Sequence, residues 1–204
     1  MNRTLRKLSQ ALGAIGKDFV VDTVQGGFPV CQVMMNIKEA KVDSVLASTA
    51  LLTDSEDYDP DEDELDTYRC VSVTGNQASV YGTVIVRGYD WSHQVVEDHI
   101  VCSGTVTASG VQPMIGIVDI ELPALVAPGD SISVGRCDKL GVYRPVKDFD
   151  DDSWVAEDYR ATGDTYWTQL GGSPVLDSDY GTIYPGAAIV DNDSFKLHYL
   201  TELF

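Results

Sequence analysis

Residues 68–143 read YRCVSVTGNQASVYGTVIVRGYDWSHQVVEDHIVCSGTVTASGVQPMIGIVDIELPALVAPGDSISVGRCDKLGVY, and this stretch decides the fold class. Short runs rich in valine and isoleucine alternate there with turn residues, which is typical of strands joined by tight turns. Strands are expected at residues 70–73, 81–89, 93–108, 114–122 and 131–136. Because these runs recur at short intervals, the sequence predicts a mostly β chain, built as an antiparallel β-sandwich or a barrel-like domain.

The strand expected at 81–89 has a clear two-residue period. Tyr81, Thr83, Ile85 and Arg87 fall on one face, and the smaller residues between them fall on the other. The run at 114–122 is the most apolar of the block, so we expect it to be a central strand. A turn is expected at 128–130, where Pro, Gly and Asp follow one another.

Outside the block, strands are expected at 18–24 and 29–37, near 141–146, and at the end of the chain at 181–184 and 194–200. Residues 39–52 suit either a helix or a strand, and the pattern does not choose between them. Residues 3–17 place leucines and an isoleucine at helical spacing, which predicts a short N-terminal helical arm at 1–17. The expected organisation is therefore an arm with leading strands (1–52), an acidic loop (53–66) and a main β-sandwich domain (67–204).

Charge is large and unevenly distributed in this chain of 204 residues. The net charge is −18, whereas residues 1–53 alone contain more basic than acidic groups. Binding duplex nucleic acid by phosphate neutralisation needs clustered Lys and Arg, so no nucleic-acid partner is expected. An anionic membrane surface is excluded on the same ground. No run of 18 apolar residues occurs, so no transmembrane helix is expected.

The acidic stretch TDSEDYDPDEDELD, residues 53–66, predicts a solvent-exposed loop, because its carboxylates repel one another. A calcium loop is the sharper hypothesis, since Asp59, Asp61 and Asp63 have the first three ligand spacings. The pattern then fails, because Glu64 stands where glycine is needed and Cys70 where a bidentate glutamate is needed. A second acidic run at 148–154 is also expected to be loop.

No motif for catalysis, a cofactor or a metal is present. Cys31, Cys70, Cys102 and Cys137 lie far apart in the sequence, without the close pairs of a zinc site, and buried free thiols are expected for the last three. The three histidines are His93, His99 and His198. His93 and His99 are expected on one strand about 20 Å apart, which is too far for them to share a metal. We therefore predict no catalytic, cofactor-binding or metal-binding residue, no cofactor and no enzymatic activity.

Three segments resemble a widespread group of virion structural proteins of tailed bacteriophages. They are CVSVTGNQASVYGTVIVRGYDWSHQVVEDHIVCSGTVTASG (70–110), APGDSISVGRCDKLGVYRPV (127–146) and DSDYGTIYPGAAIVDNDSFKLHYL (177–200). Together they cover about half of the chain, and their motifs are turn and strand signatures. The chain departs from the pattern at Tyr180, at Val142-Tyr143 and in the acidic stretch, which looks like an insertion.

The resemblance implies a head decoration or minor capsid protein, with a neck or tail component as the alternative. The implied partners are the major capsid protein and further copies of this chain, as a trimer, with the arm at 1–17 reaching a neighbour. The implied location is the capsid surface of a virion made in the host cytoplasm. A different hypothesis is a carbohydrate-binding β-sandwich that uses Trp91, Trp154 or Trp167 as a sugar platform.

Overall fold

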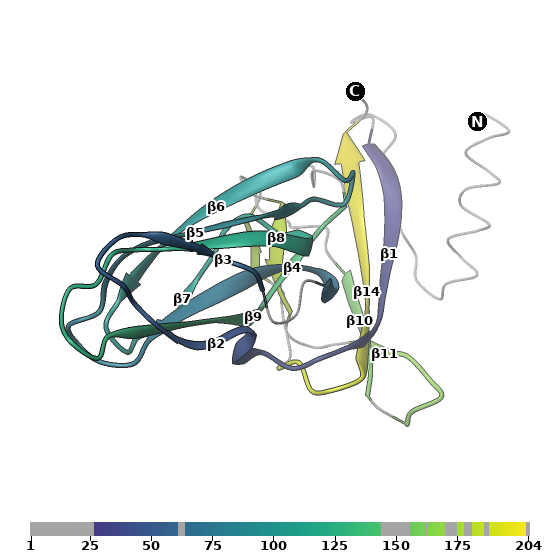
Figure 1. Cartoon of the computed structure of the whole chain (residues 1–204). Coiled ribbons are helices and arrows are strands. Elements are labelled where there is room, and N and C mark those ends of the chain that lie inside the picture. The colour runs from purple at the N-terminus through teal and green to yellow at the C-terminus, as the bar shows by residue number, and fades with distance from the viewer. Residues whose placement is uncertain are drawn as a thin grey trace, which may run out of the picture.

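The computed structural model describes residues 27–60, 64–143, 156–161, 163–169, 175–177, 181–185 and 188–202 (Figure 1). Within these ranges the chain is built from antiparallel strands, so the mostly β prediction is confirmed. No helix in the described part of the chain is long and apolar enough to cross a membrane. The expected helical arm at 1–17 and the expected strand at 18–24 lie outside the described residues.

The larger of two sheets has ten strands and curls into half a barrel. Its main path runs β12-β13-β9-β4-β8-β5-β6, while β2 pairs with β9, β3 with β8 and β7 with β4. The strands are β2 (Lys41–Ala50), β3 (Glu56–Tyr58), β4 (Glu64–Gly75), β5 (Tyr81–Tyr89), β6 (Val95–Ser103), β7 (Ala108–Ser109), β8 (Met114–Leu122), β9 (Ser131–Gly141), β12 (Val175–Asp177) and β13 (Thr182–Tyr184). The concave side of this sheet holds the main hydrophobic core.

Strand β5 shows why these residues form this sheet. Val84 and Val86 are buried in the main core, whereas Tyr81 and Arg87 lie on the outer face, as the two-residue period predicts. Strand β8 lies between β4 and β5 and contributes buried Met114 to the same core. The expected central position of residues 114–122 is therefore confirmed.

Two segments differ from the simplest sequence interpretation. Residues 41–50, which suited a helix or a strand, form strand β2 against β9. Strand β9 runs unbroken to Gly141, although separate strands were expected at 131–136 and 141–146. It continues because Leu140 is fully buried in a second core and Lys139 pairs with Asp177 at 3.1 Å.

The acidic stretch is loop only in part. Glu56–Tyr58 forms strand β3 on the end of β8, and Glu64–Gly75 forms β4. The carboxylate of Asp66 is buried rather than solvated, because it accepts hydrogen bonds from Arg69 and from the backbone N–H of Lys38. Asp61 and Asp63, two of the three expected calcium ligands, lie outside the described residues.

The smaller sheet has four strands in the order β1-β14-β10-β11. They are β1 (Gly27–Ile37), β10 (Ala156–Arg160), β11 (Thr168–Gln169) and β14 (Asp193–Glu202). Phe195, Leu197 and Tyr199 of β14 are buried in the second core against Leu140 of β9, which confirms the alternation expected near the end of the chain. This core joins the small sheet to one end of the large sheet.

We call that joined end the base, and buried polar groups hold it together. Arg69 is fully buried and donates to the Cys137 carbonyl, the Lys38 carbonyl and the Asp66 carboxylate. Gln32 of β1 donates to the Gly141 carbonyl at 2.9 Å and accepts from the backbone N–H of Tyr143. All of these bonds except that between Arg69 and Asp66 link segments that are distant in the sequence, so the base fixes β1, β4 and β9 relative to one another.

Candidate functional site: an uncharged end of the large sheet

Four connections meet at the end of the large sheet opposite the base, on the left of Figure 1. They follow β2, β4, β6 and β8, and apart from Asp54 and Asp130 at the far ends of two of them they contain no Asp, Glu, Lys, Arg or His. In a chain with a net charge of −18 this is an unusual local composition. We call this end the uncharged tip and define it as residues 50–53, 75–82, 101–107 and 123–129.

Backbone hydrogen bonds tie the four connections to one another. The Gly75 N–H donates to the Gly104 carbonyl at 3.1 Å, and the Gly104 N–H donates to the Val80 carbonyl at 2.7 Å. The Leu125 N–H donates to the Leu52 carbonyl at 2.6 Å, which joins the connection after β8 to that after β2. The tip is thus ordered before any partner arrives, which lowers the entropic cost of binding.

Asn76 and Asp130 fasten the turn that precedes β9. The Asn76 side chain donates to the Gly129 carbonyl and accepts from the Ser131 N–H. The buried Asp130 carboxylate accepts from Ser79 Oγ at 2.6 Å, from Gln77 at 2.6 Å and from a backbone N–H at 2.8 Å. Hydrogen bonding by Ser79 is the main cause that lowers the pKa of Asp130 below its usual value.

Close backbone packing requires glycine where two of these connections touch. A Cβ on Gly75 would lie 2.6 Å from the Gly104 carbonyl oxygen and 2.7 Å from Val80 Cβ. Gly104 itself has a φ of 66°, in the left-handed region that glycine adopts without strain. Strand β6 ends at Ser103 just before it, so the strand expected at 93–108 stops at this glycine.

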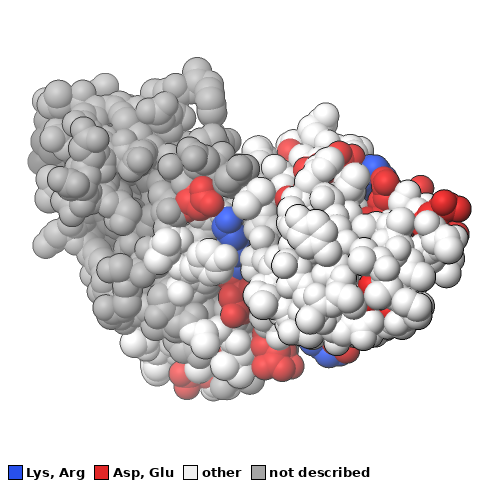
Figure 2. Space-filling model, turned by 90° about the vertical axis from the view of Figure 1, so that its left-hand side faces the viewer, with Lys and Arg blue, Asp and Glu red and all other residues white. Residues whose placement is uncertain are grey.

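The tip exposes large apolar side chains. Figure 2 looks onto this end and shows a broad uncharged surface with acidic side chains towards its margin. Scattered single apolar residues on a surface need no explanation, but several large apolar side chains gathered at one charge-free end are typical of a protein contact site. The exposed residues are Leu52, Tyr81, Val101, Val106 and Val126.

The outer face of β5, β6 and β8, nearer the base, has the opposite character. Arg87 donates to Glu97, Asp119 and Glu121, each at 2.8 Å. These carboxylates outnumber the guanidinium that they surround, so this face keeps a negative charge. Covering it with a partner would remove several charged groups from water at a large cost.

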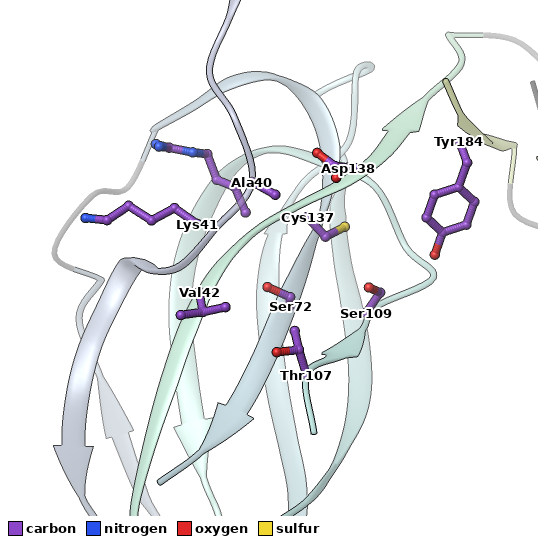
Figure 3. A pocket seen from close by; sticks show the side chains of 10 residues that line it. Ala40, Lys41, Val42, Ser72, Thr107, Ser109, Cys137, Asp138 and Tyr184 are labelled. Atoms are coloured by element: carbon purple, nitrogen blue, oxygen red, sulfur yellow. The ribbon is translucent and has the colours of Figure 1, made fainter. Parts of the chain in front are cut away.

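A shallow pocket of about 230 Å³ lies on the outer face beside β2, β7 and β9 (Figure 3). Ser72, Ser109 and Thr107 present hydroxyl groups to it, and the Tyr184 hydroxyl points towards Ser109. The Lys41 side chain extends away from these hydroxyls. The lining can hydrogen-bond a small polar group.

The cysteines and histidines form no metal site within the described residues. Cys70, Cys102 and Cys137 are buried free thiols, as predicted, whereas Cys31 is exposed on β1. Burial raises the pKa of the Cys31 and Cys102 thiols above the usual value, so neither is activated as a nucleophile. Two histidines contact carboxylates: His99 contacts Glu97 at 2.5 Å, and His198 contacts Asp158 at 3.2 Å.

Two of the tryptophans expected as sugar platforms are described, Trp91 in the connection after β5 and Trp167 just before β11. Trp91 is exposed beside Tyr143, with ring centroids 6.3 Å apart. The Trp167 ring lies on the small sheet and is covered by cations, with Lys196 Nζ 3.8 Å from its centroid. Trp154 lies outside the described residues.

Sequence reasoning missed the uncharged tip, although its signal was readable. The stretches 44–53, 71–86, 100–118 and 122–129 contain no ionisable acid, base or histidine. Only the strand order shows that these four uncharged stretches come together at one end of the sheet. Comparisons with protein families, curated proteins and solved structures found no match to this chain.

Proposed function

We propose that this chain is a virion structural protein of a tailed bacteriophage that works by binding other proteins through the uncharged tip. Within the particle, we place it on the head as a decoration protein on the lattice of the major capsid protein. The observation that carries the proposal is the set of exposed apolar side chains on a charge-free end of an otherwise acidic molecule.

The physical argument concerns the cost of removing a surface from water. Burying an exposed Val106 or Leu52 side chain against a partner contributes on the order of 1–2 kcal/mol each. No charged group of the tip loses hydration in the process, since the tip has none, and the neighbouring Asp130 is already buried. Elsewhere the acidic surface opposes non-specific association, so contact through the tip is favoured over contact through other faces.

The turns that carry the resemblance to phage virion proteins are also those that build the tip. The VTGN motif ends at Asn76 and the PGD motif at Asp130. Their residues are joined directly, because the Asn76 N–H donates to the Ser131 carbonyl and its side chain bonds Gly129. This coincidence supports assigning contact function to the tip.

Self-association and an N-terminal helical arm at 1–17 that reaches a neighbouring molecule remain part of the proposal. A decoration protein of this kind needs no catalytic group, since many copies each add a small binding free energy to the lattice. It would resist internal pressure by bridging neighbouring capsid subunits.

The test is the number of copies per particle, measured by quantitative mass spectrometry of purified virions against the major capsid protein. Decoration predicts hundreds of copies per particle. A count of roughly a dozen or fewer is the value expected for a symmetric neck or tail ring, and it would contradict the decoration assignment. Absence of the chain from purified particles would contradict the virion proposal as a whole.

A further inference from the structure

Strand β1 forms the edge of the small sheet, and that edge is unusually suited to accept another strand. Within the part of the chain that the structure describes, β1 pairs with β14 alone, and no described strand lies along its other side. The strand has eleven residues, reading GFPVCQVMMNI, without a charged side chain. A long apolar edge of this kind is a template for strand addition.

The other edges of the two sheets carry features that discourage pairing. Edge strand β6 presents Glu97 and His99, and β2 presents Lys41 and Asp43 and has an irregular register against β9. The end strands β11 and β12 have only two and three residues. Charged side chains, irregular register and short length are the usual means by which proteins protect sheet edges.

Strand β1 has one such feature, Pro29, which removes a single backbone donor. Its register against β14 is regular from Gly27 to Met34, before an irregularity that precedes Ile37. Between these two points lies an unprotected stretch, 30–35. On its outer face Cys31, Val33 and Met35 are exposed.

We infer that β1 pairs antiparallel with β1 of a second copy, giving a two-fold dimer with a continuous eight-stranded sheet. We take a second copy of β1 as the strand that pairs with this edge, because it brings no charged side chain to the contact between the two strands. Antiparallel self-pairing also places Val33 and Met35 of both copies on one face, where they cover one another. The large net charges of the two bodies are screened over distances beyond about 8 Å, so local composition governs the contact.

The dimer would present two uncharged tips. The second core joins the small sheet to the base, so β1 lies at the end of the molecule away from the tip. Self-pairing therefore leaves both tips accessible. A dimer with two docking tips could bridge two sites on a lattice. This bridging role rests on the proposed function, whereas the dimer itself does not.

The test is sedimentation equilibrium of the full-length chain in reducing buffer, from about 1 to 100 µM. We expect the wild-type chain to be a dimer in this range. The double substitution V33D/M35D places like charges opposite one another across the seam, and it should raise the dimer dissociation constant by about tenfold or more. The near-UV circular dichroism spectrum checks that this variant is folded.

The matched control is Val118→Asp. Val118 and Val33 are each 43% exposed. Val118, however, lies in β8, which is already paired on both edges, with β4 and with β5. V118D should remain dimeric, and so should V106D, which alters the tip. A wild-type monomer or trimer, a V33D/M35D variant that still dimerises, or equal dissociation of V118D would overturn the inference.

Hydrogen exchange gives a second measurement that does not depend on a variant. Backbone amides in 30–35 should exchange more slowly at high than at low protein concentration if β1 pairs in the dimer. Exchange independent of concentration in a chain that does dimerise would place the contact elsewhere and overturn the inference. Failure to find the chain in virions would leave both measurements unaffected.

Discussion

The two ends of the large sheet differ in their charged residues: the base contains ion pairs with buried cations, whereas the tip has no charged side chain. At the base, two buried cations are paired with carboxylates: Arg69 with the buried Asp66 at 3.0 Å, and Lys139 with the half-buried Asp177 at 3.1 Å. At the uncharged tip, the exposed surface has no charged side chain and presents apolar ones, among them Val106 and Val126. Both ends are cross-linked by hydrogen bonds between distant segments.

This difference separates the residues that hold the fold from those available for contact. A buried ion pair makes a fold sensitive to loss of either partner, because the remaining charge is left without compensation. A charge-free exposed surface contributes little to folding but can be covered by a partner at low desolvation cost. Substitutions at the base should therefore act on stability, and those at the tip on binding.

The largest expected effect on stability comes from breaking the base. Arg69→Met removes the donor to the Cys137 and Lys38 carbonyls and leaves the Asp66 carboxylate buried without its partner. The free energy of unfolding should fall by about 3–5 kcal/mol, as measured by urea denaturation. A loss below about 1 kcal/mol would show that the buried pair does not hold the base.

A smaller effect is expected from distorting the tip. Gly75→Ala places a methyl group against the Gly104 carbonyl oxygen and Val80, with no room for it. The expected cost is about 1–3 kcal/mol, accompanied by faster hydrogen exchange at the Gly104 N–H. The base should keep wild-type exchange at the Tyr143 N–H, and equal acceleration at both ends would contradict independent behaviour of the two ends.

Acid should loosen the tip through Asp130. Since hydrogen bonds lower the pKa of this carboxyl in the folded protein, its contribution to stability is full above the unfolded pKa of about 3.9. The contribution is lost as pH falls below that value towards the folded pKa. Comparing thermal midpoints of wild type and Asp130→Asn from pH 7 to pH 3 checks this: the difference should shrink as the pH falls. A difference constant with pH would contradict it.

The smallest effect is expected on the outer face of β5, β6 and β8. Arg87→Met removes the centre of the acidic cluster, but its ion pairs are solvent-exposed and screened. The thermal midpoint should change far less than in Arg69→Met, and salt should reduce the change further. A loss comparable to that of Arg69→Met would mean that exposed and buried ion pairs stabilise this protein alike.

Local patterns predicted most strands but not their assembly. The alternation in 81–89 reflects which side of β5 faces the core, so it could be read directly from Tyr81 to Arg87. Residues 41–50 were ambiguous because their strand is set by pairing with β9, some ninety residues away. For the same reason the sequence expectation that Asp66 is a solvated loop residue was wrong: its partner Arg69 is buried only when β4 meets β9.

The candidate site was harder to predict than the fold. Each charge-free connection is unremarkable alone, and only the strand order brings Leu52, Val106 and Val126 to the same end. Sequence motifs pointed instead to turns, such as that at 128–130, whose role in joining the connections is structural. The proposed contact surface is thus a property of topology rather than of any one motif.

The most direct measurement of the central claim compares two valines at opposite ends of the large sheet. Val106 in the tip is 71% exposed, and Val95 at the start of β6 is 66% exposed, so aspartate at either position should be tolerated by the fold. Each purified variant is co-sedimented with particles assembled without this chain. We predict that V106D binds at least about tenfold more weakly than wild type, a loss of about 1.4 kcal/mol, and that V95D binds like wild type. Equal binding by the two variants, or weaker binding by V95D, would contradict the assignment of the contact to the uncharged tip.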